Sequence, residues 1–153
     1  WLAIALMQSG MTEKGFKALT ILNPANKYLN NSSAEIFKNE PYFMTADIYT
    51  NPQCYGRGGW SIYTGAATWY YRLIFEWFVG IKIKGKEVRF NSCLPDEWEE
   101  YEVNMDYKNT QFHVVVTRGN HSGQFDNDEP FESIPLDGRN HEVRIVIARR
   151  NEN

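Results

Sequence analysis

Residues 65–90 read GAATWYYRLIFEWFVGIKIKGKEVRF, and the hydrophobic pattern of this stretch changes at Gly80. Before Gly80, apolar side chains cover most of a helical surface, and polar positions recur at every fourth residue: Thr68, Arg72 and Glu76. This spacing is typical of an α-helix with one polar stripe. After Gly80, polar and apolar residues alternate, as they do in a β-strand. The stretch predicts an α+β chain with a boundary near Gly80, dividing it into 1–80 and 81–153.

The predicted helix, from about Gly65 to Val79, is apolar around most of its circumference and is expected to be buried on most sides. Its ~15 residues are too few to cross a bilayer, and no run in the chain is long and apolar enough to do so. The helix needs neighbours on several faces. The other helices predicted here cannot supply all of them, so we expect the missing partners to lie before Trp1.

Two shorter helices are predicted at the N-terminal end, joined by a tight turn into an α-hairpin. Trp1–Ser9 is apolar on nearly all sides, and Gly10 provides a stop. Thr12 is the expected N-cap of a second helix, which reaches about Leu22 and ends before a proline.

A long loop is predicted over residues 25–59, where helical periodicity is weak and Asn, Ser, Pro and Gly are frequent. Short ordered pieces are expected at 36–38 and 42–48. A loop of this length in a compact protein is more often functional than idle.

The segment after Gly80 predicts an antiparallel β-domain with one buried face. Alternation predicts these strands: 81–83, 88–90, 101–107, 112–116, 134–136 and 143–147. The first two are expected to form a hairpin through 84–86. Lys108-Asn109 is expected to turn the chain between two of them, and Gly119–Glu129 is expected to be a polar loop. The last two strands are expected to form a hairpin through Asp137-Gly138.

Composition excludes several classes of protein. The net charge of −3 over 153 residues argues against nucleic-acid binding, so no nucleic-acid partner is expected. Cys54 and Cys93 lack metal-ligand spacing and cannot make a disulfide framework, which favours a reducing, cytoplasmic location. The three histidines show no metal pattern. The chain opens on Trp1 within an apolar helix, without the features of a signal peptide, and we expect it to be a piece of a larger protein.

The most informative local motif is a glycine-rich loop that runs into the long helix, GRGGWSIYTGAA at 56–67. Thr64 can cap this helix, and the amides of Gly65 and Ala66 would then point out of its N-terminus. Gly65 has no side chain, so an anion could approach the backbone closely. This geometry suits phosphate. Local chemistry alone, however, favours an ordinary N-cap after a turn.

A series of motifs changes that balance. In order, these are Glu40-Pro41-Tyr42-Phe43-Met44-Thr45-Ala46-Asp47-Ile48-Tyr49, Gly56-Arg57-Gly58-Gly59-Trp60, Tyr63-Thr64-Gly65-Ala66-Ala67, and Cys93-Leu94-Pro95 before Trp98. Over nearly its whole length the chain resembles the C-terminal part of the inverting glycoside phosphorylases of glycoside hydrolase family 94. That family includes cellobiose and chitobiose phosphorylases and the phosphorylase-like domain of cyclic β-1,2-glucan synthases. Each motif alone is weak, but their order and spacing are specific.

The resemblance implies a fold and a reaction. Residues 1–80 would be the last helices of a six-hairpin α/α toroid, and 81–153 an antiparallel, jelly-roll-like β-sandwich. The complete enzyme would cleave a β-linked gluco-oligosaccharide with inorganic phosphate as co-substrate, releasing a sugar 1-phosphate with inverted configuration. No cofactor is implied. Family phosphorylases are often dimers, so a homodimer is expected.

The same resemblance divides the site between this chain and the rest of the protein. Thr64 and Gly65 match the family's phosphate-binding Thr-Gly. The general acid, an aspartate, and the phosphate-binding histidine and arginine lie upstream in the family, so no catalytic residue is expected here. The 153 residues alone are therefore expected to be inactive.

Four residues of the long loop and the glycine-rich loop are candidates for sugar binding: Glu40, Tyr42, Arg57 and Trp60. Aromatic rings can stack on sugar faces, although core packing explains most rings in a protein. Glu40 could equally be a loop carboxylate in solvent or in a salt bridge. Asp47 is better explained as a structural cap or a partner of Arg57. Arg57 could approach phosphate or brace the loop.

The remaining charged groups suggest no site. An acidic cluster surrounds Trp98: Asp96, Glu97, Glu99 and Glu100. It is expected to be a solvated turn, since it lacks the spacing of a calcium loop, and no metal is expected. Three arginines are expected on an exposed face and tail: Arg144, Arg149 and Arg150.

Two other functions remain open. The chain could belong to a cyclic β-1,2-glucan synthase, in which the resemblance implies a chain-length-controlling domain; the lead-in at 51–55 looks closer to that branch. It could instead be a non-catalytic carbohydrate-binding module that uses exposed aromatics. The Tyr63-Thr64-Gly65 motif argues against the module, because a binding module does not need an anion pocket.

Overall fold

The computed structural model describes residues 1–62 and 64–149, so the predictions for Tyr63 and Arg150 lie outside the described residues. The chain is a mixed α+β protein with two compact units, Trp1–Ile74 and a second that begins at Phe75. Four α-helices, all in the first unit, and three sheets are found among the described residues. The division lies within the long predicted helix, ahead of Gly80.

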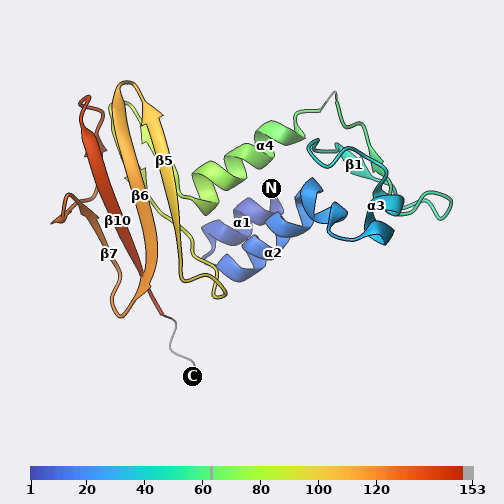
Figure 1. Ribbon diagram of the computed structural model, residues 1–153, viewed down its shortest axis with the longest axis horizontal. Coiled ribbons are helices and arrows are strands. Elements are labelled where there is room, and N and C mark those ends of the chain that lie inside the picture. The colour runs from blue at the N-terminus through green and yellow to red at the C-terminus, as the bar shows by residue number, and fades with distance from the viewer. Residues whose placement is uncertain (63, 150–153) are drawn as a thin grey trace. The chain divides into compact units, whose positions relative to one another are not determined.

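The predicted α-hairpin is present at the start of the first unit. α1 (Leu2–Gln8) and α2 (Thr12–Leu22) lie side by side in Figure 1. The N–H of Gly10 donates to the Met7 carbonyl at 3.1 Å, and Gly10 has φ 73°. The N–H of Met11 donates to the Leu6 carbonyl at 2.9 Å. This is a Schellman ending, and it confirms Gly10 as the stop of the first helix.

The predicted N-cap of the second helix is wrong. α2 begins at Thr12 itself, Met11 holds the N-cap position, and no side chain caps the helix. The reason lies in the turn: the backbone hydrogen bonds that close α1 already fix Met11, so the turn rather than a hydroxyl sets where α2 starts. Asn23 follows α2 in an extended conformation, as the Asn23-Pro24 pair predicts.

The long predicted loop is more ordered than expected. It contains the 3₁₀ segment η1 (Pro24–Tyr28), the helix α3 (Asn31–Phe37) and the short antiparallel strands β1 (Asp47–Ile48) and β2 (Gly58–Gly59). The side chain of Asn30 caps α3, accepting from the Ser33 N–H at 2.8 Å. The predicted short pieces at 36–38 and 42–48 therefore coincide with the end of α3 and with β1.

The long helix has the predicted extent but not a uniform α-helical hydrogen-bond pattern. α4 (Ala66–Arg72) continues into a π-helical segment, η2 (Leu73–Phe78). Gly80 follows with φ 80°, and a side chain there would collide with the backbone of Asn91. The prediction that this helix is buried on most sides is wrong for α4, which has no buried residue.

The second unit is built from eight strands in two sheets, counted among its described residues. Their bounds are β3 (Ile81–Lys84), β4 (Glu87–Phe90), β5 (Glu100–Tyr107), β6 (Thr110–Gly119), β7 (Gly123–Asp126), β8 (Glu129–Pro130), β9 (Ile134–Pro135) and β10 (Asn140–Ala148). The five-stranded sheet has the order β5-β6-β10-β7-β8, and the three-stranded sheet has the order β3-β4-β9. Figure 1 shows β5, β6, β10 and β7 side by side.

The C-terminal pairing corrects three predictions. The expected hairpin between 134–136 and 143–147 does not form, because β9 pairs with β4 and β10 pairs with β6 and β7. The pairing of β10 with β6 is parallel, so the unit is not purely antiparallel. The predicted polar loop at Gly119–Glu129 instead contains β7, whose turn into β8 holds Asn127 and Asp128 at φ 48° and 68°. Positive φ at two successive residues is typical of a tight hairpin turn.

Both sheets contribute to one set of buried side chains. The three-stranded sheet provides Ile81, Val88, Phe90 and Ile134, and the five-stranded sheet provides Phe112, Val114, Val116, Val143 and Ile145. The rings of Phe90 and Phe112 lie 6.3 Å apart, so residues of the two sheets meet in this core. Along β6 and β10, buried and more exposed residues alternate, which confirms the one buried face expected from the sequence.

Candidate functional site

The glycine-rich loop is joined to the segment that begins at Glu40 by the β1–β2 ribbon. Asp47 pairs with Gly59, and Ile48 pairs with Gly58. The N–H of Ala46 lies 3.1 Å from the Gly59 carbonyl and 3.3 Å from the Trp60 carbonyl. Two of the motifs that were linked only by sequence order are therefore neighbours in space.

Gly58 and Gly59 are packed against their own chain and are not open to a ligand. Both are buried. A side chain at Gly58 would meet Phe37, Asn39 and Thr45, and one at Gly59 would meet Asp47 and Tyr49. These glycines thus allow the ribbon to form.

Arg57 takes part in the ribbon through its backbone. Its carbonyl accepts from the Tyr49 N–H at 2.9 Å, and its own N–H donates to the Cys54 carbonyl at 3.1 Å. Its side chain is exposed. Among the described residues, Arg57 and Asp47 form no ion pair, so the alternative in which they are partners is wrong.

Trp60 has an unusual backbone and an exposed ring. Its φ is 55°, in the left-handed region that a bulky side chain rarely adopts, and 68% of the residue is exposed. Such conformations persist where the surroundings impose them and are concentrated at functional sites. The hydrogen bond from the Ala46 N–H to the Trp60 carbonyl helps to hold Trp60 in its left-handed conformation. Tyr42 is 76% exposed, and its ring lies 5.1 Å from that of Phe43.

Glu40 and its neighbour Asn39 each hold a buried polar atom without a partner. The Oε2 of Glu40 and the Nδ2 of Asn39 are shielded from solvent and make no hydrogen bond with the residues that the structure describes. Unsatisfied buried groups are rare because each costs the free energy of its lost hydration. The alternatives for Glu40, a carboxylate in solvent or in a salt bridge, therefore do not describe this oxygen.

At the start of α4, one of the two amides proposed for phosphate is already used. The Oγ1 of Thr64 accepts a hydrogen bond from the Ala66 N–H at 3.0 Å. Thr64 therefore shields the Ala66 amide, although Gly65 rather than Thr64 occupies the N-cap position. Beside Gly65 there is open space where a side chain would be, and its N–H donates to no acceptor among the described residues.

The predicted residues thus fall into two groups within the first unit. Glu40, Arg57 and Trp60 belong to the segments that the ribbon holds together, whereas Thr64 and Gly65 begin α4. No hydrogen bond between the described residues links the second group to the ribbon.

The second unit contains two histidine–carboxylate clusters that the sequence did not predict. His113 on β6 lies between Glu142 (Nδ1 to Oε2, 2.7 Å) and Glu102 (Nε2 to Oε2, 3.4 Å). The hydrogen bond to Glu142, and then that to Glu102, raise the pKa of His113. The strand register could have revealed this cluster, because Glu142 pairs with His113.

The other cluster is buried. His141 is 6% exposed and stacks on Phe112, with ring centroids 5.2 Å apart. Its Nδ1 lies 2.7 Å from the Asp126 Oδ2, and its Nε2 lies 3.2 Å from the Asp137 Oδ1. These contacts join β7, β10 and the segment between β9 and β10. They satisfy a buried polar ring, which is a structural role.

The acidic turn around Trp98 is held by arginines. Asp96 pairs with Arg118 at 3.3 Å, and Glu99 pairs with Arg149 at 2.8 Å. The acidic side chains are largely exposed, as predicted. No group of three or more potential metal ligands is found among the described residues, which extend through Arg149 except for residue 63. None of the described helices is long and apolar enough to cross a membrane.

Comparison with known proteins gives this geometry a context. Residues 1–80 match the sequence model of the glycosyl hydrolase 94 superfamily, catalytic domain. The chain is 34% identical, over 81% of its length, to cyclic beta-(1,2)-glucan synthase NdvB of Rhizobium meliloti, and covers 4% of that protein. It is 24% identical, over 91% of its length, to N,N'-diacetylchitobiose phosphorylase of Vibrio proteolyticus, and covers 17% of it. It is 30% identical, over 45% of its length, to cellobionic acid phosphorylase of Neurospora crassa, and covers 9% of it.

Proposed function

Because the chain belongs to the glycosyl hydrolase 94 superfamily, we propose that it is the C-terminal part of an inverting glycoside phosphorylase. The complete protein cleaves a β-linked gluco-oligosaccharide with inorganic phosphate and releases a sugar 1-phosphate. The chain spans only 4% to 17% of the three relatives described above, so most of such an enzyme lies outside it. The general acid and the other phosphate ligands belong to that remainder, and the 153 residues alone are inactive.

The single observation that carries the phosphate role is the open space beside Gly65 at the start of α4. We propose that the Gly65 N–H and the Thr64 hydroxyl donate to phosphate. The Thr64 oxygen accepts from Ala66, which leaves its O–H hydrogen free to donate outward. A phosphate whose nucleophilic oxygen attacks the anomeric carbon needs donors on its other oxygens, to hold both its position and its charge.

The sugar side of the site is assigned to the ribbon and the segment before it: Glu40, Tyr42, Arg57 and Trp60. For Glu40 the assignment rests on the resemblance of its segment, because its Oε2 is shielded from solvent and is not open to a sugar hydroxyl. The exposed Trp60 ring, held at φ 55°, presents an apolar face of the kind that stacks on a pyranose ring. Arg57 has an exposed side chain that could serve either the sugar or the phosphate.

The same proposal extends to the fold of the complete protein. The first unit would close an α/α toroid, and the exposed Trp69 and Tyr71 of α4 would be covered by helices of that toroid. The second unit would be the β-sandwich cap, which the meeting of Phe90 and Phe112 from its two sheets supports. We also propose that the complete protein is a homodimer and that it works in the reducing cytoplasm.

A second function is favoured by one comparison. The 34% identity to the cyclic beta-(1,2)-glucan synthase extends over 81% of the chain, including much of the second unit. On this alternative the chain belongs to a domain that controls chain length in a glucan synthase. The phosphate and sugar roles of the residues would be unchanged, and only the polymer and its linkage would differ.

The test uses the complete protein. It is incubated with inorganic phosphate and β-1,2-, β-1,3- and β-1,4-linked gluco-oligosaccharides, and sugar 1-phosphate is assayed. Product from one linkage supports phosphorolysis and names the substrate. Shortening of β-1,2-glucan only when phosphate is present supports the glucan synthase alternative. A folded protein that forms no sugar 1-phosphate with any linkage would overturn both.

A further inference from the structure

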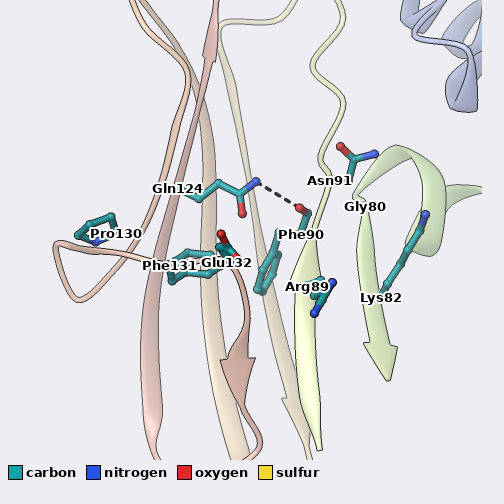
Figure 2. A pocket seen from close by; sticks show the side chains of 9 residues that line it. All are labelled: Gly80, Lys82, Arg89, Phe90, Asn91, Gln124, Pro130, Phe131 and Glu132. Atoms are coloured by element: carbon teal, nitrogen blue, oxygen red, sulfur yellow. Dashed lines mark hydrogen bonds between the residues drawn. The ribbon is translucent and has the colours of Figure 1, made fainter. Parts of the chain in front are cut away.

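The second unit has a pocket of about 570 Å³ that the proposed function does not use. Its volume lies in the range of small-molecule sites, ~300–1,000 Å³. The lining residues come from β3, β4, β7, β8 and the segments beside them, and Figure 2 labels them all: Gly80, Lys82, Arg89, Phe90, Asn91, Gln124, Pro130, Phe131 and Glu132. All of them belong to one compact unit.

Two cations of this pocket are placed opposite each other. Lys82 on β3 is the register partner of Arg89 on β4, so both side chains leave the same face of the three-stranded sheet. Like charges in such a pair destabilise a sheet. Their local partners compensate only weakly: Lys82 lies over the Trp77 ring at 3.6 Å, and Arg89 lies 3.9 Å from Glu87 in a largely exposed pair. An oxyanion between the two cations would remove the repulsion.

The other side of the pocket has groups that suit a sugar ring. The Phe131 ring is half-buried and is held edge-on against the buried Phe90, with centroids 5.7 Å apart. The Nε2 of Gln124 donates to the Phe90 carbonyl at 3.2 Å, as Figure 2 shows. This contact fixes the amide and leaves its Oε1 as an acceptor for a hydroxyl. Asn91 adds a second, exposed amide.

Glu132 distinguishes between ligand classes. A carboxylate in the pocket would repel a ligand made only of phosphate, but it accepts hydrogen bonds from hydroxyl groups. From this combination we propose that the pocket binds an acidic saccharide, a sugar ring bearing a carboxylate or a phosphate. The oxyanion is bound by Lys82 and Arg89, and the ring lies against Phe131 with its hydroxyls toward Glu132 and Gln124. The site is separate from the one proposed for phosphorolysis.

The test is a titration of the isotope-labelled complete protein, followed by the backbone amide shifts of the second unit. The probes are a glucosyl-β-glucuronic acid disaccharide, glucose 1-phosphate and neutral cellobiose. We expect saturable shifts at residues 89–91, 124 and 131–132 with at least one acidic probe, and at least about tenfold weaker binding of cellobiose, since it lacks a charge-assisted contact. Whether the glucuronide or the phosphate binds more tightly identifies the oxyanion.

Two variants and one control make the test specific. Arg89→Gln and Phe131→Ala are each expected to weaken binding of the acidic probe by about tenfold or more. Arg144→Gln is the control, because Arg144 is likewise an exposed strand arginine but lies outside the pocket, over the Phe125 ring. If Phe131→Ala disturbs the fold, the binding of the acidic probe to Arg89→Gln tests the proposal instead. Arg89 is exposed on β4, so its substitution should leave the fold intact.

Three results would overturn the proposal: no saturable shift in the pocket with any acidic probe, equal binding of cellobiose, or unchanged binding in Arg89→Gln. Phosphorolysis by the complete protein is measured separately. It should survive Arg89→Gln, so the failure of one proposal is distinguishable from the failure of the other.

Discussion

The Thr64 hydroxyl oxygen lies 3.0 Å from the backbone nitrogen of Ala66 and accepts its hydrogen bond. This contact gives Thr64 a structural role, since it satisfies an amide in the first turn of α4. It also orients the hydroxyl so that its hydrogen points away from that amide. A single side chain can therefore satisfy an amide of the first turn and bind phosphate, and the two roles predict different responses to substitution.

The first prediction separates these roles with Thr64→Ala and Thr64→Ser in the complete protein. The alanine variant loses the hydroxyl, and we expect kcat/KM for phosphate to fall by about 10- to 100-fold, the cost of one hydrogen bond to a charged group. It should also lose about 1 kcal/mol of stability, because the hydrogen bond from the Ala66 N–H is lost. Serine keeps the hydroxyl and should retain most activity. Equal losses in the two variants, or an unchanged dependence on phosphate, would contradict the binding role.

The second prediction compares two glycines of the same loop. Gly58→Ala places a methyl group against Phe37, Asn39 and Thr45, and we expect it to lower the free energy of unfolding by about 1–3 kcal/mol. Gly65→Ala is the matched control, because a methyl group there enters open space. It should leave urea denaturation nearly unchanged while weakening phosphate binding. If Gly65→Ala unfolds the protein as readily as Gly58→Ala does, the space beside Gly65 is not a ligand site.

The same two glycines show how far sequence reasoning reaches at the site. The motif predicted a loop that leads into a helix, and this is confirmed. It could not separate packed glycines from an open one, because the atoms that fill the space beside Gly58 come from Phe37 and Thr45, which are distant along the chain. The buried Glu40 oxygen was likewise unpredictable, since burial of one atom depends on packing.

For the fold, local patterns were sufficient where partners are neighbours in sequence. The hairpin of β3 and β4 and the turn at Lys108-Asn109 were predicted because alternation and turn residues specify them. The parallel pairing of β6 and β10 was not predicted, since their apolar positions fit either direction and the choice depends on the whole sheet. The Asn127-Asp128 turn had a recognisable signature that was overlooked within a polar stretch.

The third prediction concerns the backbone of Trp60. Trp60→Asn removes the ring but tolerates φ near 55°, so the free energy of unfolding should change by less than about 1 kcal/mol. In the complete protein we expect KM for the oligosaccharide to rise by about tenfold, because a stacked ring contributes about 1 kcal/mol beyond its buried area. Tyr55→Asn is the control for losing an exposed aromatic side chain that is not assigned to sugar binding. If both variants raise KM equally, Trp60 has no specific role in binding sugar.

The fourth prediction follows from the raised pKa of His113. The folded state binds a proton on this ring more tightly than the unfolded state does, so the Glu142 and Glu102 contacts stabilise the fold fully below the unfolded pKa, about 6.5. This stabilisation is lost as pH rises through the folded pKa. In urea denaturation, His113→Gln should therefore lose more stability relative to the wild type at pH 5.5 than at pH 8.5.

His121→Gln serves as the control for this titration, because His121 is exposed and makes no hydrogen bond to a carboxylate among the described residues. A pH dependence that His113→Gln shows and His121→Gln does not is assigned to the two glutamate contacts. A His113→Gln deficit that is constant from pH 5.5 to 8.5 would mean that the ring acts only through neutral hydrogen bonds. A deficit that grows with pH would reverse the sign and contradict the linkage between His113 and its two glutamates.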